Sequence, residues 1–359
     1  TKCNTHNIFI HFPFDPECLI CEQNKAHRAY CKTVTAPRVD ANPAPTQFGE
    51  AITADHKILN WFDKSRDHDR AALIVQDKAT YWLQGYPAPS KNGKETKKAF
   101  NRFLGLGHKN VHVYSDNSKE IESACDMLDF SHDTSQPYRS ETNGLIENAV
   151  KRVNQGTSCA LSQSGLTTAW WAQAMAIYCF PRNVVDVLVS GKTAFEQRFE
   201  VPYQGPLIPL GAEISYVPHS PADKERVHKY GPKRLEGIFL GYEQEHGGGW
   251  TKKVFVLDSE ELEKKDCPND CHPRPVSIQE IRPKLDENGN FIFPVAEGYL
   301  SQPGVGDRDM KIAERRAAKK LAQQERVEAN RKKLKEEEEQ RKSDPAEQAT
   351  MEEDFWTDW

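Results

Sequence analysis

The order of strand-like and helix-like segments between residues 48 and 183 is the feature that most constrains the fold of this chain. β-prone runs come first, and segments with apolar residues at helical spacing follow them. In chain order, strands are predicted at 51–59, 71–77 and 79–87, a helix at 93–106, a strand at 111–116, and helices at 118–130, 142–161 and 167–180. Such a series predicts a layered α/β domain.

The rest of the chain is less apolar and more charged. Of the 359 residues, 37% are hydrophobic and 28% charged, whereas globular chains usually have about 45–50% apolar residues. The formal net charge is −5, but the last 17 residues carry six acids and no base. Residues 1–342 therefore carry about +1, once these six charges are removed from −5. The overall acidity does not exclude a nucleic-acid partner.

Composition also suggests the boundaries of the regions. The predicted organisation is a His/Cys segment at 1–31, a proline-rich linker at 32–47, the α/β core at 48–200, a small all-β barrel at 206–260, an irregular loop region at 261–305, a charged helical or disordered segment at 306–342, and an acidic tail at 343–359. No apolar run approaches the ~20 residues that span a bilayer. We therefore expect a soluble, intracellular chain without a membrane partner.

The first 31 residues have the composition of a metal site. A Cys-x2-Cys pair presents two thiolates from one turn, and two imidazoles nearby would complete a tetrahedral structural zinc site. The preferred ligands of one zinc ion are His6, His11, Cys18 and Cys21. A rival set keeps the two cysteines and adds His27 and Cys31. A third interpretation is a cysteine-rich linker with free thiols.

Three acids of the α/β region form a candidate site. Asp55 lies in the first predicted strand, Asp116 at the end of a later strand, and Glu147 on the following helix. Carboxylates that converge repel one another unless a cation neutralises them, and Mg²⁺ prefers oxygen ligands. Spacing alone is weak support in a chain with 53 acids, so three unrelated surface acids remain the alternative.

Several segments resemble a known family. They are TADHK (53–57), QDKATYW (76–82), VHVYSDN (111–117) and PYRSETNGLIENAVKRVN (137–154), which resemble the core of retroelement integrases. The segment at 210–242 is similar to the region after the core in Copia-type LTR-retrotransposon integrases, the integrase portion of a Pol polyprotein. Residues 11–28 resemble the second half of the family's His-His-Cys-Cys zinc domain.

The resemblance implies a fold and an activity. The fold would be an RNase H-like core with a mixed five-stranded sheet, followed by an SH3-like barrel. Asp55, Asp116 and Glu147 match the carboxylates that hold two Mg²⁺ or Mn²⁺ ions, and one structural Zn²⁺ would lie at the N-terminus. The activity would be 3′-end processing and strand transfer on the element's DNA ends and target DNA. A homo-oligomer in the nucleus is implied, with an earlier stage in cytoplasmic virus-like particles.

Two departures support a second interpretation. Only 30 residues separate Asp116 from Glu147, fewer than is usual in the family. His6 and His11 also lie unusually close to Cys18. The alternative is a catalytically inactive, domesticated integrase-derived protein that binds DNA or a partner.

The DNA-contacting residues are predicted from helix geometry and local charge. Lys151 and Asn154 follow Glu147 by four and seven residues, which places all three on one helix face, and Arg152 adds a neighbouring charge. In the barrel region, the predicted phosphate contacts are Lys229, Lys233 and Arg234. A solvated helix lysine is the alternative for Lys151, and a solvated loop is the alternative for the three residues of the barrel region.

Overall fold

The computed structural model describes residues 6–15, 17–25, 44–60, 63–134, 144–264, 270–298, 300 and 332. Residues 1–304 form one compact unit and residues 305–359 a second, of which only Lys332 is described. The charged segment at 306–342 and the acidic tail at 343–359 therefore lie almost wholly outside the described residues. All the helices and strands with assigned bounds belong to the first unit.

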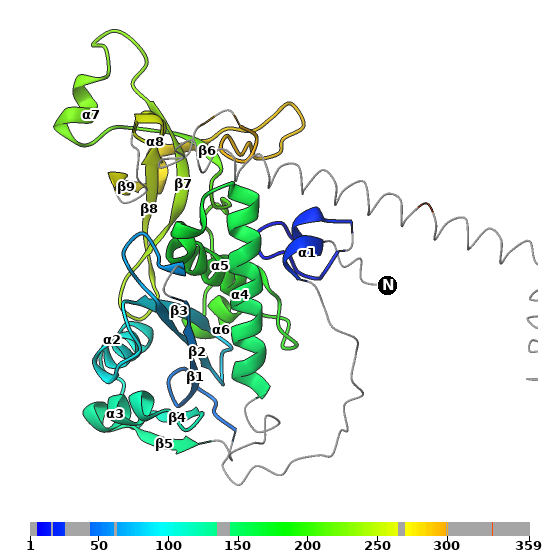
Figure 1. Cartoon of the computed structure of the whole chain (residues 1–359), viewed down its shortest axis with the longest axis vertical. Helices are drawn as coiled ribbons and strands as arrows, with labels where there is room; N and C mark the ends of the chain where they lie inside the picture. The colour runs from blue at the N-terminus through cyan, green and yellow to red at the C-terminus, as the bar shows by residue number, and fades with distance from the viewer. Residues whose placement is uncertain are drawn as a thin grey trace, which may run out of the picture. The chain divides into compact units, whose positions relative to one another are not determined.

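A mixed five-stranded sheet organises the first part of this unit (Figure 1). Its strands are β1 (Ala51–Ile58), β2 (Ala71–Asp77), β3 (Leu83–Ala88), β4 (His112–Ser115) and β5 (Ser131–Thr134). The order is β3-β2-β1-β4-β5, with antiparallel pairs from β3 to β1 and parallel pairs from β1 to β5. This topology fits the RNase H-like α/β core that the resemblance implied.

Helices cover both faces of this sheet. They are α2 (Gly93–Leu104), α3 (Lys119–Leu128), α4 (Gly144–Ser164), the 3₁₀ helix η3 (Thr168–Trp170), α5 (Trp171–Val185) and α6 (Ala194–Phe199). Every residue of β2 is buried, and successive side chains of a strand point to opposite faces. Leu73 and Val75 belong to the core with α2 and α3, whereas Ala72 and Ile74 belong to the core with α4 and α5.

Most predicted elements are confirmed, with differences at their ends. The strand predicted at 79–87 begins only at Leu83, because Asp77 accepts hydrogen bonds from the backbone and hydroxyl groups of Thr80 and holds a turn there. The predicted start of α3 at Ser118 is correct, but the Ser118 hydroxyl donates to Glu120 instead of capping the helix. β5 was not predicted, because its four residues are largely exposed and polar.

A second five-stranded sheet follows the core. Its strands are β6 (Glu213–Tyr216), β7 (Leu235–Gln244), β8 (Trp250–Asp258), β9 (Arg274–Ser277) and β10 (Ile281–Pro283), in the order β10-β6-β7-β8-β9 with antiparallel pairing throughout. Two short helices also belong to this region, α7 (Pro221–Glu225) and α8 (Ser259–Lys264), and a 3₁₀ turn, η5 (Ile278–Glu280), precedes β10. All-β character is confirmed, while an SH3-like barrel stays a prediction.

Regular secondary structure continues past the boundary predicted at residue 260. α8, β9 and β10 all follow Asp258, within the stretch that was predicted to be an irregular loop region. β9 and β10 have only four and three residues, too few to display an alternating pattern in the sequence. The second sheet also packs on the core, because Ile238 and Leu240 share a buried cluster with Ile177 of α5.

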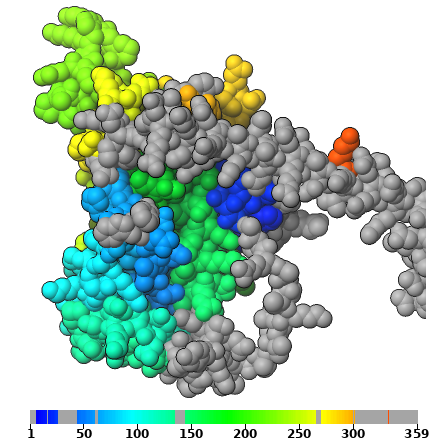
Figure 2. Space-filling view, in the orientation of Figure 1, coloured from blue at the N-terminus to red at the C-terminus, as the bar shows by residue number. Residues whose placement is uncertain are grey.

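The N-terminal residues pack against the core as well. α1 (Leu19–Asn24) lies beside α4 (Figure 1), and in Figure 2 the blue N-terminal residues lie against the green surface of that region. Ile10 is 3% exposed and belongs to the same buried cluster as Ile146 and Val153 of α4. Within the part of the chain that the structure describes, no helix has the length and apolar character needed to cross a membrane.

Candidate active site and metal centre

The sheet places Asp55 and Asp116 side by side. β1 and β4 run parallel, and Ala54 is the register partner of Ser115. Asp55 and Asp116 are the next residues on the two strands, so both carboxylates occupy the same end of this strand pair. Asp55 still belongs to β1, and Asp116 follows the last residue of β4. Parallel pairing thus joins two residues that are far apart in the sequence.

Glu147 is brought to the same place by α4. It lies in the first turn of this helix, which packs against β1. The charge of Glu147 is felt by Asp55, whose pKa rises from 3.8 to about 6. Burial is the largest cause of this rise, and the neighbouring Asp116 carboxylate and then Glu147 add to it. Asp55 is therefore within electrostatic range of both other predicted carboxylates.

Asp116 has an oxygen suited to a cation. Within the described residues, its Oδ1 atom is buried and accepts no hydrogen bond. A buried acceptor without a donor is costly. With two further carboxylates nearby, such an oxygen is suited to bind a hard divalent cation. The residues present therefore fit Mg²⁺ or Mn²⁺. Across the described residues, however, these acids do not gather their oxygens as tightly as the N-terminal His/Cys group does.

Short hydrogen bonds fix the backbone around Asp116. Its carbonyl oxygen accepts from the Ser115 hydroxyl at 2.7 Å and from the Ser118 backbone N–H at 2.8 Å. The Ser115 hydroxyl also lies 2.8 Å from His132 Nε2, on the neighbouring strand β5. These contacts hold the turn that presents the carboxylate. Sequence analysis did not find His132, because it lies in the unpredicted strand.

A lysine that sequence analysis missed lies at the edge of this site. Lys91 follows β3 in the loop before α2, and its Nζ atom lies 3.3 Å from Glu120 of α3. Its positive charge lowers the pKa of Asp55, against the larger effect of burial. No motif pointed to Lys91, because only the packing of the β3–α2 loop against α3 places it here.

The predicted DNA-contacting residues of α4 do not share one face. Lys151 is exposed and Asn154 half-buried, and both follow Glu147 at the spacing of one helix face. Arg152 instead faces α5. Burial lowers its pKa, and so does the nearby Arg182 guanidinium. The three residues thus differ in environment, and their contacts with DNA stay a prediction.

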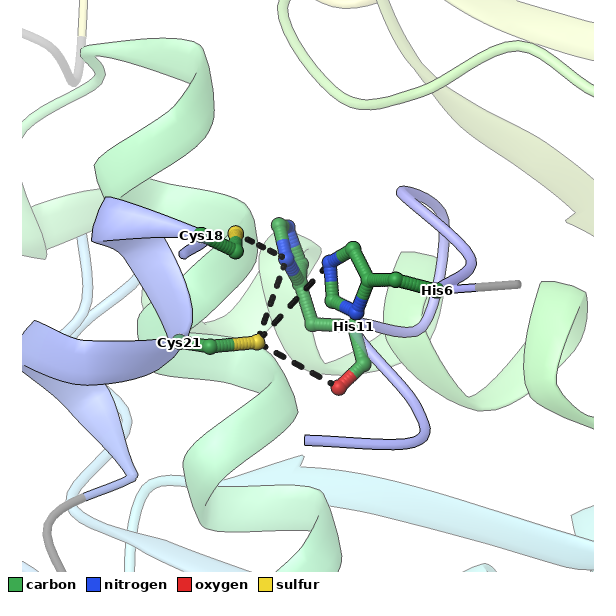
Figure 3. A group of neighbouring side chains, drawn as sticks. All are labelled: His6, His11, Cys18 and Cys21. Atoms are coloured by element: carbon green, nitrogen blue, oxygen red, sulfur yellow. Dashed lines mark hydrogen bonds between the residues drawn. The ribbon is translucent and has the colours of Figure 1, made fainter. Parts of the chain in front are cut away.

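The preferred zinc ligands converge in the structure (Figure 3). One ligand atom from each of His6, His11, Cys18 and Cys21 lies within 4.8 Å of the others. His11 Nδ1 is 3.6 Å from the Cys18 sulfur and 3.8 Å from the Cys21 sulfur. A tetrahedral zinc with bonds of about 2.0–2.3 Å separates its ligand atoms by roughly 3.3–3.8 Å. The donor set and its spacing both fit zinc.

The surroundings of these side chains prepare them as ligands. His6 Nδ1 lies 2.8 Å from the Pro13 carbonyl oxygen, an arrangement that directs Nε2 toward the cysteines and is typical of metal-bound histidines. Burial lowers the pKa of His11 to about 4, so its imidazole is neutral near pH 7. Lys25 donates to the His11 carbonyl at 2.5 Å. The rival ligands His27 and Cys31 lie outside the described residues.

The structure gives the basic residues after α7 different roles. The Arg234 guanidinium donates to the carbonyl oxygens of Ser215 and Glu280, at 3.1 and 3.0 Å. Lys233 donates to two carbonyl oxygens of the preceding turn. The Lys229 ammonium group lies 5.9 Å from the centroid of the Tyr230 ring and, among the described interactions, has no other partner.

Comparisons with known proteins agree with the sequence motifs. No family model matches the chain. It is 25% identical over 187 residues to a retrovirus-related Pol polyprotein from transposon RE1 of Arabidopsis thaliana, covering 50% of this chain and 12% of the relative. It is 24% identical over 234 residues to the Pol polyprotein from transposon RE2 of the same plant, covering 63% of this chain and 15% of the relative. The chain is thus similar to a small part of much longer polyproteins.

Three solved structures are similar at a lower level. The catalytic core domain of BIV integrase gives a TM-score of 0.31 at 17% identity, covering 42% of this chain and 95% of that one. The HTLV-2 integrase catalytic core domain in complex with magnesium gives a TM-score of 0.34 at 18% identity, covering 42% of this chain and 97% of that one. A chain of a simian T-cell lymphotropic virus intasome, in complex with a PP2A regulatory subunit, gives a TM-score of 0.37 at 15% identity. The match covers 75% of this chain and 88% of that one. Likeness at this level carries no argument about activity. The resemblance to a Copia-type integrase rests on the motifs and on the two polyproteins.

Proposed function

We propose that this chain is a retroelement integrase that cleaves and joins DNA with divalent metal ions held by Asp55, Asp116 and Glu147. The adjacency of Asp55 and Asp116 on parallel strands, with Glu147 in electrostatic range, is the observation that carries the proposal. Similarity to Pol polyproteins of transposons supports the same reaction class. DNA ends of the element and target DNA are the proposed substrates.

Each carboxylate has a role in this proposal. Asp55, Asp116 and Glu147 would hold the cations together, with Asp55 central because the charges of both other acids act on it. When bound, the cations supply electrostatic stabilisation to the attacking and leaving oxygens of a phosphoryl transfer. Ser115 and Ser118 hold the Asp116 turn in place.

The chain would position DNA with side chains beside the acids. Lys151 lies one turn along α4 from Glu147 and is exposed, which suits a contact to a DNA phosphate. The Lys91 ammonium group is a second positive side chain near Asp55. The proposed protein acts as a homo-oligomer, because two DNA ends must be handled together, and it acts in the nucleus.

A strand-transfer assay tests this function. The purified full-length chain is incubated with Mg²⁺ or Mn²⁺, a labelled duplex that carries the element's end, and a target duplex. The proposal expects processed 3′ ends and joined products that depend on the cation. A folded, zinc-loaded chain that binds DNA and yields no product with either ion would favour the inactive, domesticated alternative.

A further inference from the structure

An exposed turn on the second sheet carries a basic and aromatic tip. The loop between β6 and β7 contains α7 and projects from the sheet (Figure 1). Residues 226–234 read RVHKYGPKR, with four Lys or Arg residues, one histidine and no acid. Within this stretch we call residues 228–231 the tip turn.

Hydrogen bonds shape the tip turn. The Gly231 backbone N–H donates to the His228 carbonyl at 3.1 Å, which makes Lys229 and Tyr230 the central residues of a β-turn. The Tyr230 backbone N–H donates to His228 Nδ1 at 3.2 Å. Lys233 stabilises the same turn, because its ammonium group donates to the carbonyl oxygens of His228, at 2.9 Å, and of Lys229. The central residues are therefore held in one arrangement.

The base of the loop is anchored on both sides. Before the turn, Arg226 binds Asp223 at 3.1 Å and the buried Asp258 of β8 at 3.0 Å. After the turn, Arg234 donates to carbonyl oxygens of β6 and η5. A tip fixed at both ends loses little conformational entropy when it binds a ligand.

Among the described residues, none packs on Tyr230 in a way that would explain its position. Its exposed fraction is 86%, and its ring contacts are with two residues of the same turn, His228 at 6.2 Å between centroids and the Lys229 ammonium at 5.9 Å. A single tyrosine surrounded by polar and cationic residues is not an apolar patch of the kind that binds another protein surface. It is an aromatic face with cations beside it, which matches an anionic ligand that carries its own flat ring.

We propose that the tip turn binds an unpaired DNA base, which stacks on Tyr230 while Lys229 contacts the adjacent phosphate. Aromatic stacking of this kind accepts any base and is combined with cationic contacts to the backbone in proteins that bind single strands. The identification of the strand as DNA rests on the proposed function. Lys233 and Arg234 then act by holding the turn, and Lys229 is the residue of the three that contacts phosphate directly.

Fluorescence of 2-aminopurine tests the stacking. The full-length chain is titrated, without added Mg²⁺ or Mn²⁺, into a 12-nucleotide single strand with 2-aminopurine at its centre. Stacking on Tyr230 quenches this base in the wild type and in Tyr230→Phe. In Tyr230→Leu the quenching is lost and the affinity for the single strand falls at least about fivefold, the lower end of what one stacked base contributes. Affinity for a blunt duplex changes less than twofold.

Matched variants separate the two contacts. Lys229→Ala keeps the quenching and lowers the slope of log affinity against log salt by about 0.7, the effect of one phosphate contact on a single strand. Val189→Ala, at another fully exposed position, changes neither. Unaltered quenching and affinity in Tyr230→Leu overturn the proposal, and a change of oligomeric state in that variant with DNA binding intact assigns Tyr230 to a protein contact instead.

The test is independent of catalysis. Asp116→Asn removes the proposed activity and leaves the quenching unchanged. If the wild type joins no DNA but Tyr230 still quenches, the integrase proposal fails and the tip turn stands. If strand transfer proceeds and quenching is absent, only the tip turn fails.

Discussion

Asn24 of α1 and Ser162 of α4 exchange hydrogen bonds: Asn24 Nδ2 lies 3.1 Å from Ser162 Oγ, which lies 3.3 Å from Asn24 Oδ1. The pair joins the His/Cys segment to the helix that carries Glu147. Together with the burial of Ile10 in the core, it makes the N-terminal segment a structural part of the α/β unit. The sequence alone predicted a separate domain behind a linker.

Loss of a zinc ligand should therefore weaken the core as well as the N-terminus. Cys21→Ser should lower the bound zinc from one ion per chain toward none and the thermal midpoint of the full chain by about 5 °C or more, because metal binding contributes folding free energy. Tryptophan fluorescence follows the core, since Trp170 and Trp171 lie next to α4 in the sequence and pack in it. Cys125→Ala, a buried cysteine of α3, should retain its zinc. An unchanged midpoint in Cys21→Ser would show that the two regions are not coupled.

The raised pKa of Asp55 predicts a pH dependence of stability without divalent ions. Its folded-state pKa of about 6 lies above the ordinary value of 3.8, so the folded state favours protonated Asp55. The contribution of Asp55 to stability is therefore fully present below pH 4 and is lost as the pH rises through 6. The wild type should lose about 1–2 kcal/mol relative to Asp55→Asn between pH 4.5 and 7, after allowance for solvent screening. Urea unfolding of both proteins measures this difference. Equal pH profiles would show that Asp55 is not perturbed.

Lys151 and Arg152 should respond differently to substitution, although they are neighbours. Lys151→Ala should lower the slope of log DNA affinity against log salt by about 0.9, the effect of one phosphate contact on duplex DNA. Arg152→Ala should leave the slope unchanged and reduce stability, since its guanidinium is buried against α5. Filter binding at several salt concentrations, with denaturant unfolding, separates the two effects. A larger salt effect in Arg152→Ala would reverse the assignment.

Asn183 should be a stability determinant of the core sheet. It is fully buried, and its amide group accepts from the Leu83 N–H at 3.0 Å and donates to the Leu83 carbonyl at 2.8 Å. Asn183→Leu leaves both backbone groups of the edge strand β3 without these partners and should cost about 2–4 kcal/mol, because each buried unpaired group costs about 1–3 kcal/mol. Denaturant unfolding measures the loss. A cost below about 1 kcal/mol would mean that water replaces the amide.

The elements of the core were predictable where the local sequence was strongly β-prone or had apolar residues at helical spacing. β1 and β2 lie in β-prone runs and α2 has buried residues at helical spacing, and the structure confirms all three elements. β5, β9 and β10 were missed, because strands of three or four residues are defined by pairing with a neighbour. Pairing of residues far apart in the chain leaves no local signal in one sequence.

The residues of the candidate sites were also predictable only where the local sequence marked them. The three acids and the four candidate zinc ligands were predicted from motifs and from residue chemistry. The structure gathers one ligand atom from each of the four His/Cys residues within 4.8 Å of the others, and the charges of Asp116 and Glu147 act on Asp55. Lys91, His132 and Asn24 were not found, since each acts through tertiary contacts that no motif records. The environment of Arg152, whose pKa is lowered by burial and by Arg182 of α5, could not be read from its charge alone.

The most direct measurement is strand transfer by Asp116→Asn beside Asp126→Asn, a matched substitution of an exposed acid on the adjacent α3. Asp116→Asn keeps the size of the side chain and removes the charge that neighbours Asp55. The account predicts that this variant keeps its fold and zinc content and loses strand transfer by about 1,000-fold or more, since metal ions contribute several kcal/mol to such reactions. Asp126→Asn should retain wild-type activity. Strand transfer by Asp116→Asn at the wild-type rate would contradict the proposed site.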